Sequence, residues 1–230
     1  MTNAVSIAQL GSSNVTMRNR LINGNFNIDQ RYNGTSATPT NNAYTVDRWC
    51  FSLSQASKFT VQQNSGNAPA AQGFSQCLKI ASSSAYSIGS GDYFLGYQVI
   101  EGYNCADLAW GTVSAKSVTL SFQVYSSLTG TFGGSLWNSN ATRCYPYTYT
   151  ISSANTWQQI SLTIAGDTSG TWVGATNGVG IRVLLGFGVG SNRSFSAGSW
   201  QSGNVQGATG ATSVVGTNGA TFYITGVQLE

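Results

Sequence analysis

The residues best suited to chemistry in this chain are aromatic rather than ionisable. Trp137, Trp172 and Trp200 lie beside glycine, asparagine and serine, in sequence typical of exposed loops. Aromatic side chains combine a large apolar face with a polar edge, and they can stack on the C–H faces of sugar rings or pack at interfaces. The alternative for each tryptophan is structural packing, because tryptophan is highly buried on average.

Ionisable residues are scarce, and this argues against most catalytic mechanisms. The 230 residues include no histidine, which excludes Ser-His-Asp and Cys-His catalysis and imidazole bases. Seven acidic residues leave open a glycosidase-type pair, for example Asp92 with Glu101 or Asp107, although turn and strand-end positions explain them as well. We therefore expect a protein that is not an enzyme and that needs no cofactor.

The few basic residues do not form the pattern of a nucleic-acid-binding protein. Ten lysines and arginines give a net charge of +3, but they are spread along the chain rather than gathered in a stripe. The sequence contains no apolar run of 18 residues, so we expect no membrane insertion. The first ten residues lack the basic flank and apolar core of a secretory signal. A spaced acidic loop typical of calcium sites is also absent, so no metal site is predicted.

The four cysteines lie far apart and form no C-x-x-C pair. Cys50, Cys77 and Cys105 stand in apolar stretches, and Cys144 is the fourth. We expect buried free thiols that act as small apolar side chains, while one disulfide stays open because the count is even.

Alternation of apolar and polar residues dominates the chain and predicts β-strands. The clearest runs begin at Val118, at Ile160 and at Ile181, the last placing Ile181, Val183, Leu185, Phe187 and Val189 on one face. Further strands are expected at 47–54, 59–63, 74–81, 93–101, 145–153 and 221–230. A bulge at Gly226 would return Val227 and Leu229 to the face of Phe222 and Ile224.

About ten short strands without a long helix predict an all-β fold. We expect a two-sheet antiparallel sandwich of jelly-roll type over residues 21–230, with a short helical turn within 103–110. Residues 1–20 are interpreted as an arm for attachment or oligomerisation, and residues 202–219 as a long loop. Phe26, Ile28, Trp49 and Phe51 are assigned to the core.

Several sequence blocks resemble those of bacteriophage tail-fibre and related virion proteins. The first is Asn19-Arg-Leu-Ile-Asn-Gly-Asn-Phe-Asn-Ile-Asp-Gln-Arg31, followed by Tyr44-Thr-Val-Asp-Arg-Trp49. Similar blocks in the same order are 100–111, 118–124, 157–172 and 220–230. Such proteins usually continue past the Gln-Leu-Glu block, so this chain is either a shorter member or lacks that part.

The resemblance implies a carbohydrate-binding-like jelly-roll module displayed on a phage particle. Proteins of this kind are commonly trimeric, assemble with other virion proteins in the host cytoplasm and often bind host-surface glycans. Three observations lead us to expect a tail-fibre or receptor-binding component acting in host adsorption. They are the resemblance, the scarcity of residues suited to catalysis and the aromatic residues in loop-like sequence. The expected ligand contacts are Trp137, Tyr145, Trp172 and Trp200, with Asp167 as a polar anchor. The alternative is a capsid decoration or fibre-joining protein with a purely structural role.

Overall fold

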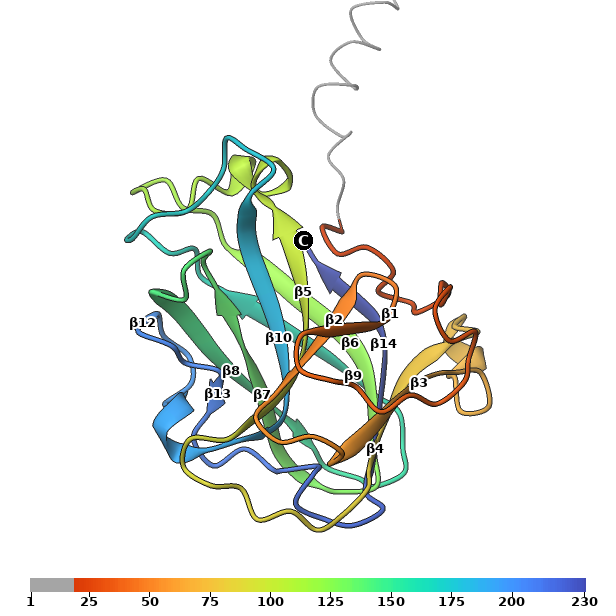
Figure 1. Ribbon diagram of the computed structural model, residues 1–230. Helices are drawn as coiled ribbons and strands as arrows, with labels where there is room; N and C mark the ends of the chain where they lie inside the picture. Colours follow the sequence, from red (N-terminus) through yellow and green to blue (C-terminus); the bar gives the residue numbers. More distant parts are fainter. Residues whose placement is uncertain (1–18) are drawn as a thin grey trace, which may run out of the picture.

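The protein is described by a computed structural model covering residues 19–230 (Figure 1). These residues form strands and loops, and the helical parts are four three-residue 3₁₀ turns, η1 (Ala70–Gln72), η2 (Gly102–Asn104), η3 (Ala106–Leu108) and η4 (Ser191–Arg193). The strands are β1 (Ala43–Val46), β2 (Trp49–Leu53), β3 (Phe59–Asn64), β4 (Cys77–Ser82), β5 (Tyr93–Glu101), β6 (Val118–Ser126), β7 (Gly130–Trp137), β8 (Arg143–Ile151), β9 (Gln158–Ile164), β10 (Val179–Val189), β11 (Ser194–Phe195), β12 (Gln201–Ser202), β13 (Gly207–Ala208) and β14 (Thr221–Leu229).

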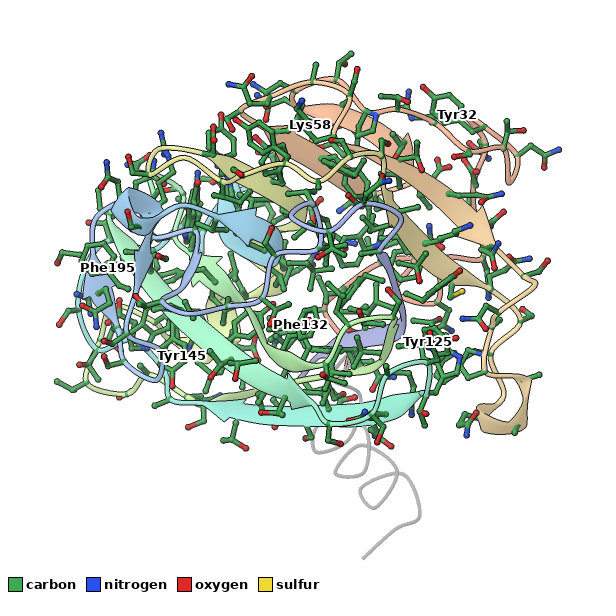
Figure 2. The ribbon with its side chains drawn as sticks, turned by 90° about the horizontal axis from the view of Figure 1, so that it is seen from below. Tyr32, Lys58, Tyr125, Phe132, Tyr145 and Phe195 are labelled. Atoms are coloured by element: carbon green, nitrogen blue, oxygen red, sulfur yellow. The ribbon has the colours of Figure 1, made fainter. Side chains whose placement is uncertain are left out.

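Two antiparallel sheets pack face to face and confirm the predicted sandwich. The larger sheet has seven strands in the order β1-β2-β5-β10-β7-β8-β12, and the smaller has five in the order β3-β4-β14-β6-β9. The main apolar core lies between them, where residues such as Phe51, Phe132 and Phe222 are fully buried. In Figure 2, Phe132 lies in the middle of the molecule, whereas Tyr145 lies toward one side.

Most of the strands predicted from alternation are present. In β6 every second residue from Val118 to Ser126 is buried, and β5 has the predicted bounds. The predicted bulge is also confirmed, because the pairing of β14 with β6 shifts between Thr225 and Gln228, and Gly226 has a φ of 62°. Val227 and Leu229 are therefore fully buried with Phe222 and Ile224 in the same core.

Strand β7 was not predicted, and its glycines explain both the miss and the strand. A Cβ on Gly134 would lie 2.0 Å from the carbonyl oxygen of Leu184 and 2.5 Å from the hydroxyl of Tyr147, so only glycine fits. Tyr147 is the cross-strand partner of Gly134 and donates a hydrogen bond from its hydroxyl to Leu184. Apolar and polar residues do not alternate in this part of β7, because the ring of Tyr147 lies directly against the backbone at Gly134.

Two side chains do not lie where the sequence predicted. Val189 leaves the interior face of β10, because the pairing with β5 shifts between Gly186 and Gly188, and it packs beside Leu184 on the outer face. Ile28, assigned to the core, is 50% exposed, whereas Phe26, Trp49 and Phe51 are buried as expected. Ile28 lies in a loop outside the strands, where its backbone N–H and C=O both bond to the side chain of Asn23.

The first of the resembling blocks ties the start of the domain to the sheets. Asn19 accepts hydrogen bonds from the backbone of Leu21 and Leu229, and Arg20 pairs with Asp107 at 2.7 Å. Gly24 lies against Val227 so closely that a Cβ would be 2.1 Å from its carbonyl oxygen. Asn19 and Arg20 thus belong to the sandwich; the rest of the predicted arm, residues 1–18, lies outside the described residues.

The predicted long loop at 202–219 is partly built into the domain. Val205, Val214 and Val215 are buried, and β13 pairs with β11. All four cysteines are free and buried, as expected. Over the part of the chain that the structure describes, no helix is long and apolar enough to cross a membrane.

Candidate functional site

Four aromatic residues from distant parts of the sequence form a cluster at one end of the sandwich, the rim cluster. They are Trp110, Tyr145, Trp172 and Trp200. Ring centroids are separated by 4.7 Å for Trp110–Trp172, 5.2 Å for Trp110–Trp200, 5.4 Å for Trp172–Trp200 and 5.3 Å for Tyr145–Trp200. The rings meet edge to face, an arrangement that favours aromatic pairs. Trp110 is 7% exposed and the other three are half-buried.

Each indole N–H of the rim cluster is used inside the chain. Trp110 donates to the carbonyl of Lys116, and Trp200 donates to the carbonyl of Ala165. Trp172 donates to Asp167 and to the carbonyl of Ser169, both at 3.2 Å. The polar edges thus fix the rings, and any exposed part of the cluster is an apolar face.

An ion pair between Arg143 and Asp167 lies beside the rim cluster and contacts Trp172. Arg143 donates from Nε to one oxygen of Asp167 at 2.7 Å and from a terminal nitrogen to the other at 2.6 Å. Asp167 is 1% exposed, and its carboxylate also accepts from Trp172 and from the backbone of Ser169. The pairing raises the pKa of Arg143, which stays charged. Asp167 therefore orients Trp172 and does not lie open to a ligand as the predicted anchor would.

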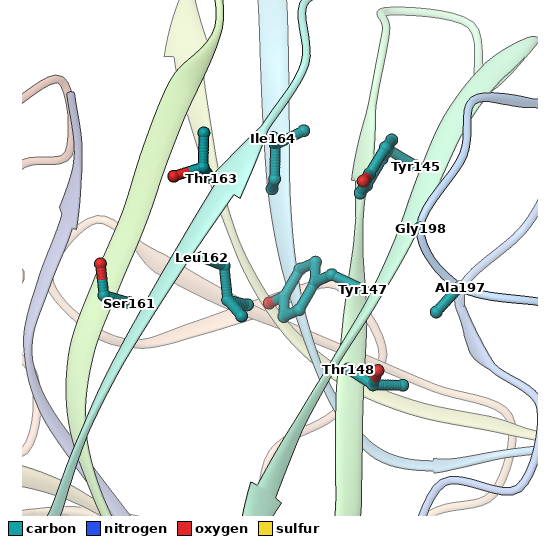
Figure 3. A pocket seen from close by; sticks show the side chains of 9 residues that line it. All are labelled: Tyr145, Tyr147, Thr148, Ser161, Leu162, Thr163, Ile164, Ala197 and Gly198. Carbon is teal, nitrogen blue, oxygen red and sulfur yellow. The ribbon is translucent and has the colours of Figure 1, made fainter.

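A groove of about 300 Å³ begins beside Tyr145 and runs between β8 and β9 (Figure 3). It is lined by Tyr145, Tyr147, Thr148, Ser161, Leu162, Thr163, Ile164, Ala197 and Gly198. Tyr147 and Leu162 point toward one another across it, whereas Ser161 and Thr163 point to the other side of β9. A volume near 300 Å³ is at the lower end of small-molecule sites.

One wall of this groove is a strand edge with unpaired backbone groups. β9 is the last strand of the five-stranded sheet and pairs only with β6 among the described residues, so its other edge faces the groove. An unpaired strand edge presents N–H and C=O groups to a partner. A tyrosine hydroxyl is ordinarily protonated near neutral pH, and burial raises the pKa of Tyr145 further, so its hydroxyl can donate a hydrogen bond.

The structure brings together four of the five predicted site residues. Tyr145, Trp172 and Trp200 meet in the rim cluster above Asp167, but Trp137 is separate. Trp137 ends β7 and is 7% exposed, so the prediction of an exposed loop position was wrong. It pairs with Cys144, the residue before Tyr145, and successive residues of a strand point to opposite faces of the sheet.

Trp110 and Arg143 belong to the site and were missed. Trp110 lies after η3 in a region predicted only as a helical turn. Arg143 begins β8 and has no acidic residue near it in sequence, because Asp167 follows β9. No short-range pattern signals either contact; the paired charges meet only through the packing of the two sheets.

The acidic pair considered for glycoside cleavage does not assemble. Asp92 precedes β5 and Glu101 ends it, which at the rise of a strand separates them by roughly 30 Å. Glycosidase carboxylates lie within about 10 Å of each other. Asp107 lies at the Glu101 end, because Arg20 bonds to both Asp107 and Asn104, and Asn104 donates to Glu101. In residues 19–230, no group of three or more potential metal-ligating side chains comes together.

No known family model matches the sequence, and no curated protein matches it. Solved structures similar to this chain include the enzymatically active domain of tailspike protein 4 of bacteriophage CBA120, with 12% identity and a TM-score of 0.48 over 92% of this chain. They also include a family 11 carbohydrate-binding module from Clostridium thermocellum, with 12% identity and a TM-score of 0.38 over 85% of this chain.

TmCBM61 in complex with β-1,4-galactotriose is similar with 10% identity and a TM-score of 0.42 over 93% of this chain. The match covers 98% of that module and 94% of the family 11 module, but only 21% of the tailspike chain. At such identities and TM-scores, no ligand or activity passes from these proteins to this chain.

Proposed function

We propose that the protein is a non-enzymatic component of a phage particle that recognises a host-surface glycan through the groove and the rim cluster. The groove joins two features that saccharide binding needs: the aromatic side chain of Tyr145 at its wall, beside Trp200, and unpaired backbone groups along β9. This juxtaposition carries the proposal. Sugar rings place C–H faces on aromatic planes while their hydroxyls hydrogen-bond to polar groups nearby.

The virion role rests on the resembling sequence blocks. They support a tail-fibre or receptor-binding component, assembled with other virion proteins in the host cytoplasm as a homotrimer and acting in host adsorption. Light scattering on the purified chain should give three times the monomer mass of 24.2 kDa. A monomer at all concentrations would contradict the trimer. Antibody labelling of purified particles would test the location on the virion.

Glycan binding is tested by an array screen with the intact chain and with variants on different faces. Trp200→Ala should reduce binding of an array hit by at least about tenfold, because it removes the stacking partner beside the groove. Trp157→Ala is the matched control: Trp157 is also half-buried, but it packs on Tyr125 of β6, away from the rim cluster.

A second variant, Tyr145→Leu, keeps the test valid if Trp200→Ala fails to fold. Tyr145→Leu keeps an apolar side chain on β8 and removes the aromatic plane together with its hydroxyl. Binding that is unchanged in both variants, with unfolding transitions like that of the wild type, would contradict the assignment of the groove. Loss of binding in Trp157→Ala as well would also contradict it.

A structural, fibre-joining role is the second candidate. It is favoured by the three indole N–H groups of the rim cluster, which are already bonded within the chain. The rings therefore offer apolar faces, which can pack against a neighbouring subunit. In that case Trp200→Ala would lower incorporation into particles, while free domain would show no adsorption to host cells.

A further inference from the structure

A second hollow lies on the outer face of the seven-stranded sheet, over β5, β10 and β7, and shares no lining residue with the groove. We call it the outer cleft. It has a volume of about 60 Å³ and is lined by Asn42, Ser52, Leu95, Tyr97, Trp137, Arg182, Leu184 and Gln206. Trp137, which lies away from the rim cluster, thus forms part of a different cavity.

Strand register explains how the floor of the outer cleft forms. Arg182 of β10 pairs with Val99 of β5 on one side and with Trp137 of β7 on the other. Two pairs further along, Leu184 is the partner of Tyr97. All these side chains share one face, because they alternate with Ile181 and Val183, which are buried in the interior core.

The outer cleft holds two buried polar atoms without partners. Nε of Arg182 and Oε1 of Gln206 are both buried and make no hydrogen bond among the described residues. Gln206 is only 5% exposed as a whole, and its backbone N–H is fixed by the carbonyl of Arg193 at 2.7 Å. Buried polar groups are usually bonded, so one orphan donor and one orphan acceptor in a single cavity leave hydrogen-bonding capacity that a bound ligand would satisfy.

The charge of Arg182 is also not balanced. The ion pairs found in residues 19–230 use Arg20, Arg48 and Arg143. On the same face Glu101 ends β5, but it accepts from Arg48 at 2.7 Å and from Asn104. Arg48, Glu101 and Arg182 together leave one positive charge unmatched at this face.

We propose that the outer cleft binds an acidic saccharide, with the sugar carboxylate on Arg182 and a sugar hydroxyl donating to Gln206. A guanidinium and a carboxylate form short, charge-assisted hydrogen bonds, and the hydroxyl supplies the donor that Oε1 lacks. The small cavity suits a carboxylate rather than a whole sugar. A neighbouring hollow of about 270 Å³, bordered by Tyr44 and Val99, offers space for a sugar ring. The choice of a saccharide rests on the proposed function; the choice of an anion rests on Arg182 and Gln206.

The test uses sodium glucuronate as the probe and methyl β-glucoside as its uncharged counterpart. In the ¹⁵N-labelled full chain, glucuronate at millimolar concentrations should shift the Arg182 Nε–H resonance, which is assigned by its absence in Arg182→Gln. The glucoside should leave it in place. Ligand-observed NMR should show glucuronate binding weakened by about tenfold or more in Arg182→Gln.

Two further variants complete the experiment. Lys79→Gln removes one positive charge from β4 in the other sheet and should leave glucuronate binding unchanged. Gln206→Leu should weaken binding without removing the charge. No resonance shift with glucuronate at tens of millimolar, or equal binding of the glucoside, would overturn the proposal. Trp200→Ala should bind glucuronate like the wild type, so failure of the groove as a glycan site is recognised separately.

Discussion

The rim cluster and the outer cleft use similar residues in opposite ways. Both contain tryptophan, tyrosine and arginine, yet Arg143 at the rim is neutralised by Asp167, whereas Arg182 in the cleft has no acidic partner within residues 19–230. The indole N–H groups of the rim all bond to nearby oxygens. In the cleft the amide oxygen of Gln206 bonds to nothing within the described chain.

This difference separates polar groups that are satisfied within the fold from polar groups that we propose a ligand satisfies. A satisfied polar network rigidifies its surroundings, and the rim cluster is therefore a fixed surface of apolar ring faces. An unsatisfied buried group costs free energy of folding unless something outside the chain completes it. We therefore expect polar recognition at the outer cleft and stacking at the rim.

The largest expected effect is the loss of Arg143. Asp167 is 1% exposed, and in Arg143→Ala its carboxylate loses two hydrogen bonds and its counter-charge. Breaking a buried pair on one side costs about 3–5 kcal/mol, and we expect a fall of about 3 kcal/mol in the free energy of unfolding. Urea unfolding at neutral pH measures it. A change below about 1 kcal/mol would show that the rim pair stabilises no more than a surface pair does.

The second effect is the loss of Trp200. Trp200→Ala removes a ring that contacts Trp110, Tyr145 and Trp172, but the side chain is only half-buried. We expect about 2 kcal/mol of lost stability, below the 3–5 kcal/mol typical of a fully buried tryptophan. The unfolding midpoint in urea measures it, with Trp157→Ala as a comparison. Unchanged stability would mean that the rings of the rim do not support one another.

Much of the sandwich could be predicted because two-residue alternation is a local signal. β6 and the bulge at Gly226 followed from that signal, since one face of each strand is buried. β7 could not be predicted from alternation, because Gly133 and Gly134 lie where neighbouring backbone and Tyr147 leave no space for a side chain. Crowding of this kind depends on other strands and leaves no mark in the periodicity.

The site was less predictable for the same reason. Trp172 and Trp200 were found because glycine and serine surround them in sequence. Arg143 could not be paired with Asp167, because the two residues come together only when β8 of one sheet lies near β9, the last strand of the other sheet. The outer cleft also depends on register across three strands, which fixes Arg182 between Val99 and Trp137.

A third, smaller effect is the acid sensitivity of the ion pair between Arg48 and Glu101, which is more exposed than the pair at the rim. The hydrogen bond from Arg48 lowers the pKa of Glu101, so the pair stabilises the fold above the ordinary pKa of a glutamate, and that contribution is lost as the pH falls through the lowered value. Both side chains are about one-third exposed, which keeps the effect below about 1 kcal/mol. Glu101→Gln should therefore show a smaller loss of stability between pH 7 and pH 3 than the wild type. Equal acid sensitivity of the two proteins would contradict it.

The smallest expected effect concerns Arg182, and it is the one that most sharply divides the two regions. If Arg182 stabilised the fold as Arg143 does, Arg182→Gln would cost several kcal/mol. Its Nε has no partner, so the substitution removes a partly desolvated charge and breaks no hydrogen bond of that atom. We expect the free energy of unfolding to stay within about 0.5 kcal/mol of the wild type or to rise slightly. Urea unfolding without ligand measures this, and adding glucuronate should stabilise the wild type but not the variant, because a ligand that binds the folded state alone raises its stability. A marked loss of stability in Arg182→Gln would show that Arg182 is a structural residue like Arg143. It would contradict the assignment of Arg182 as the anion-binding group of the outer cleft.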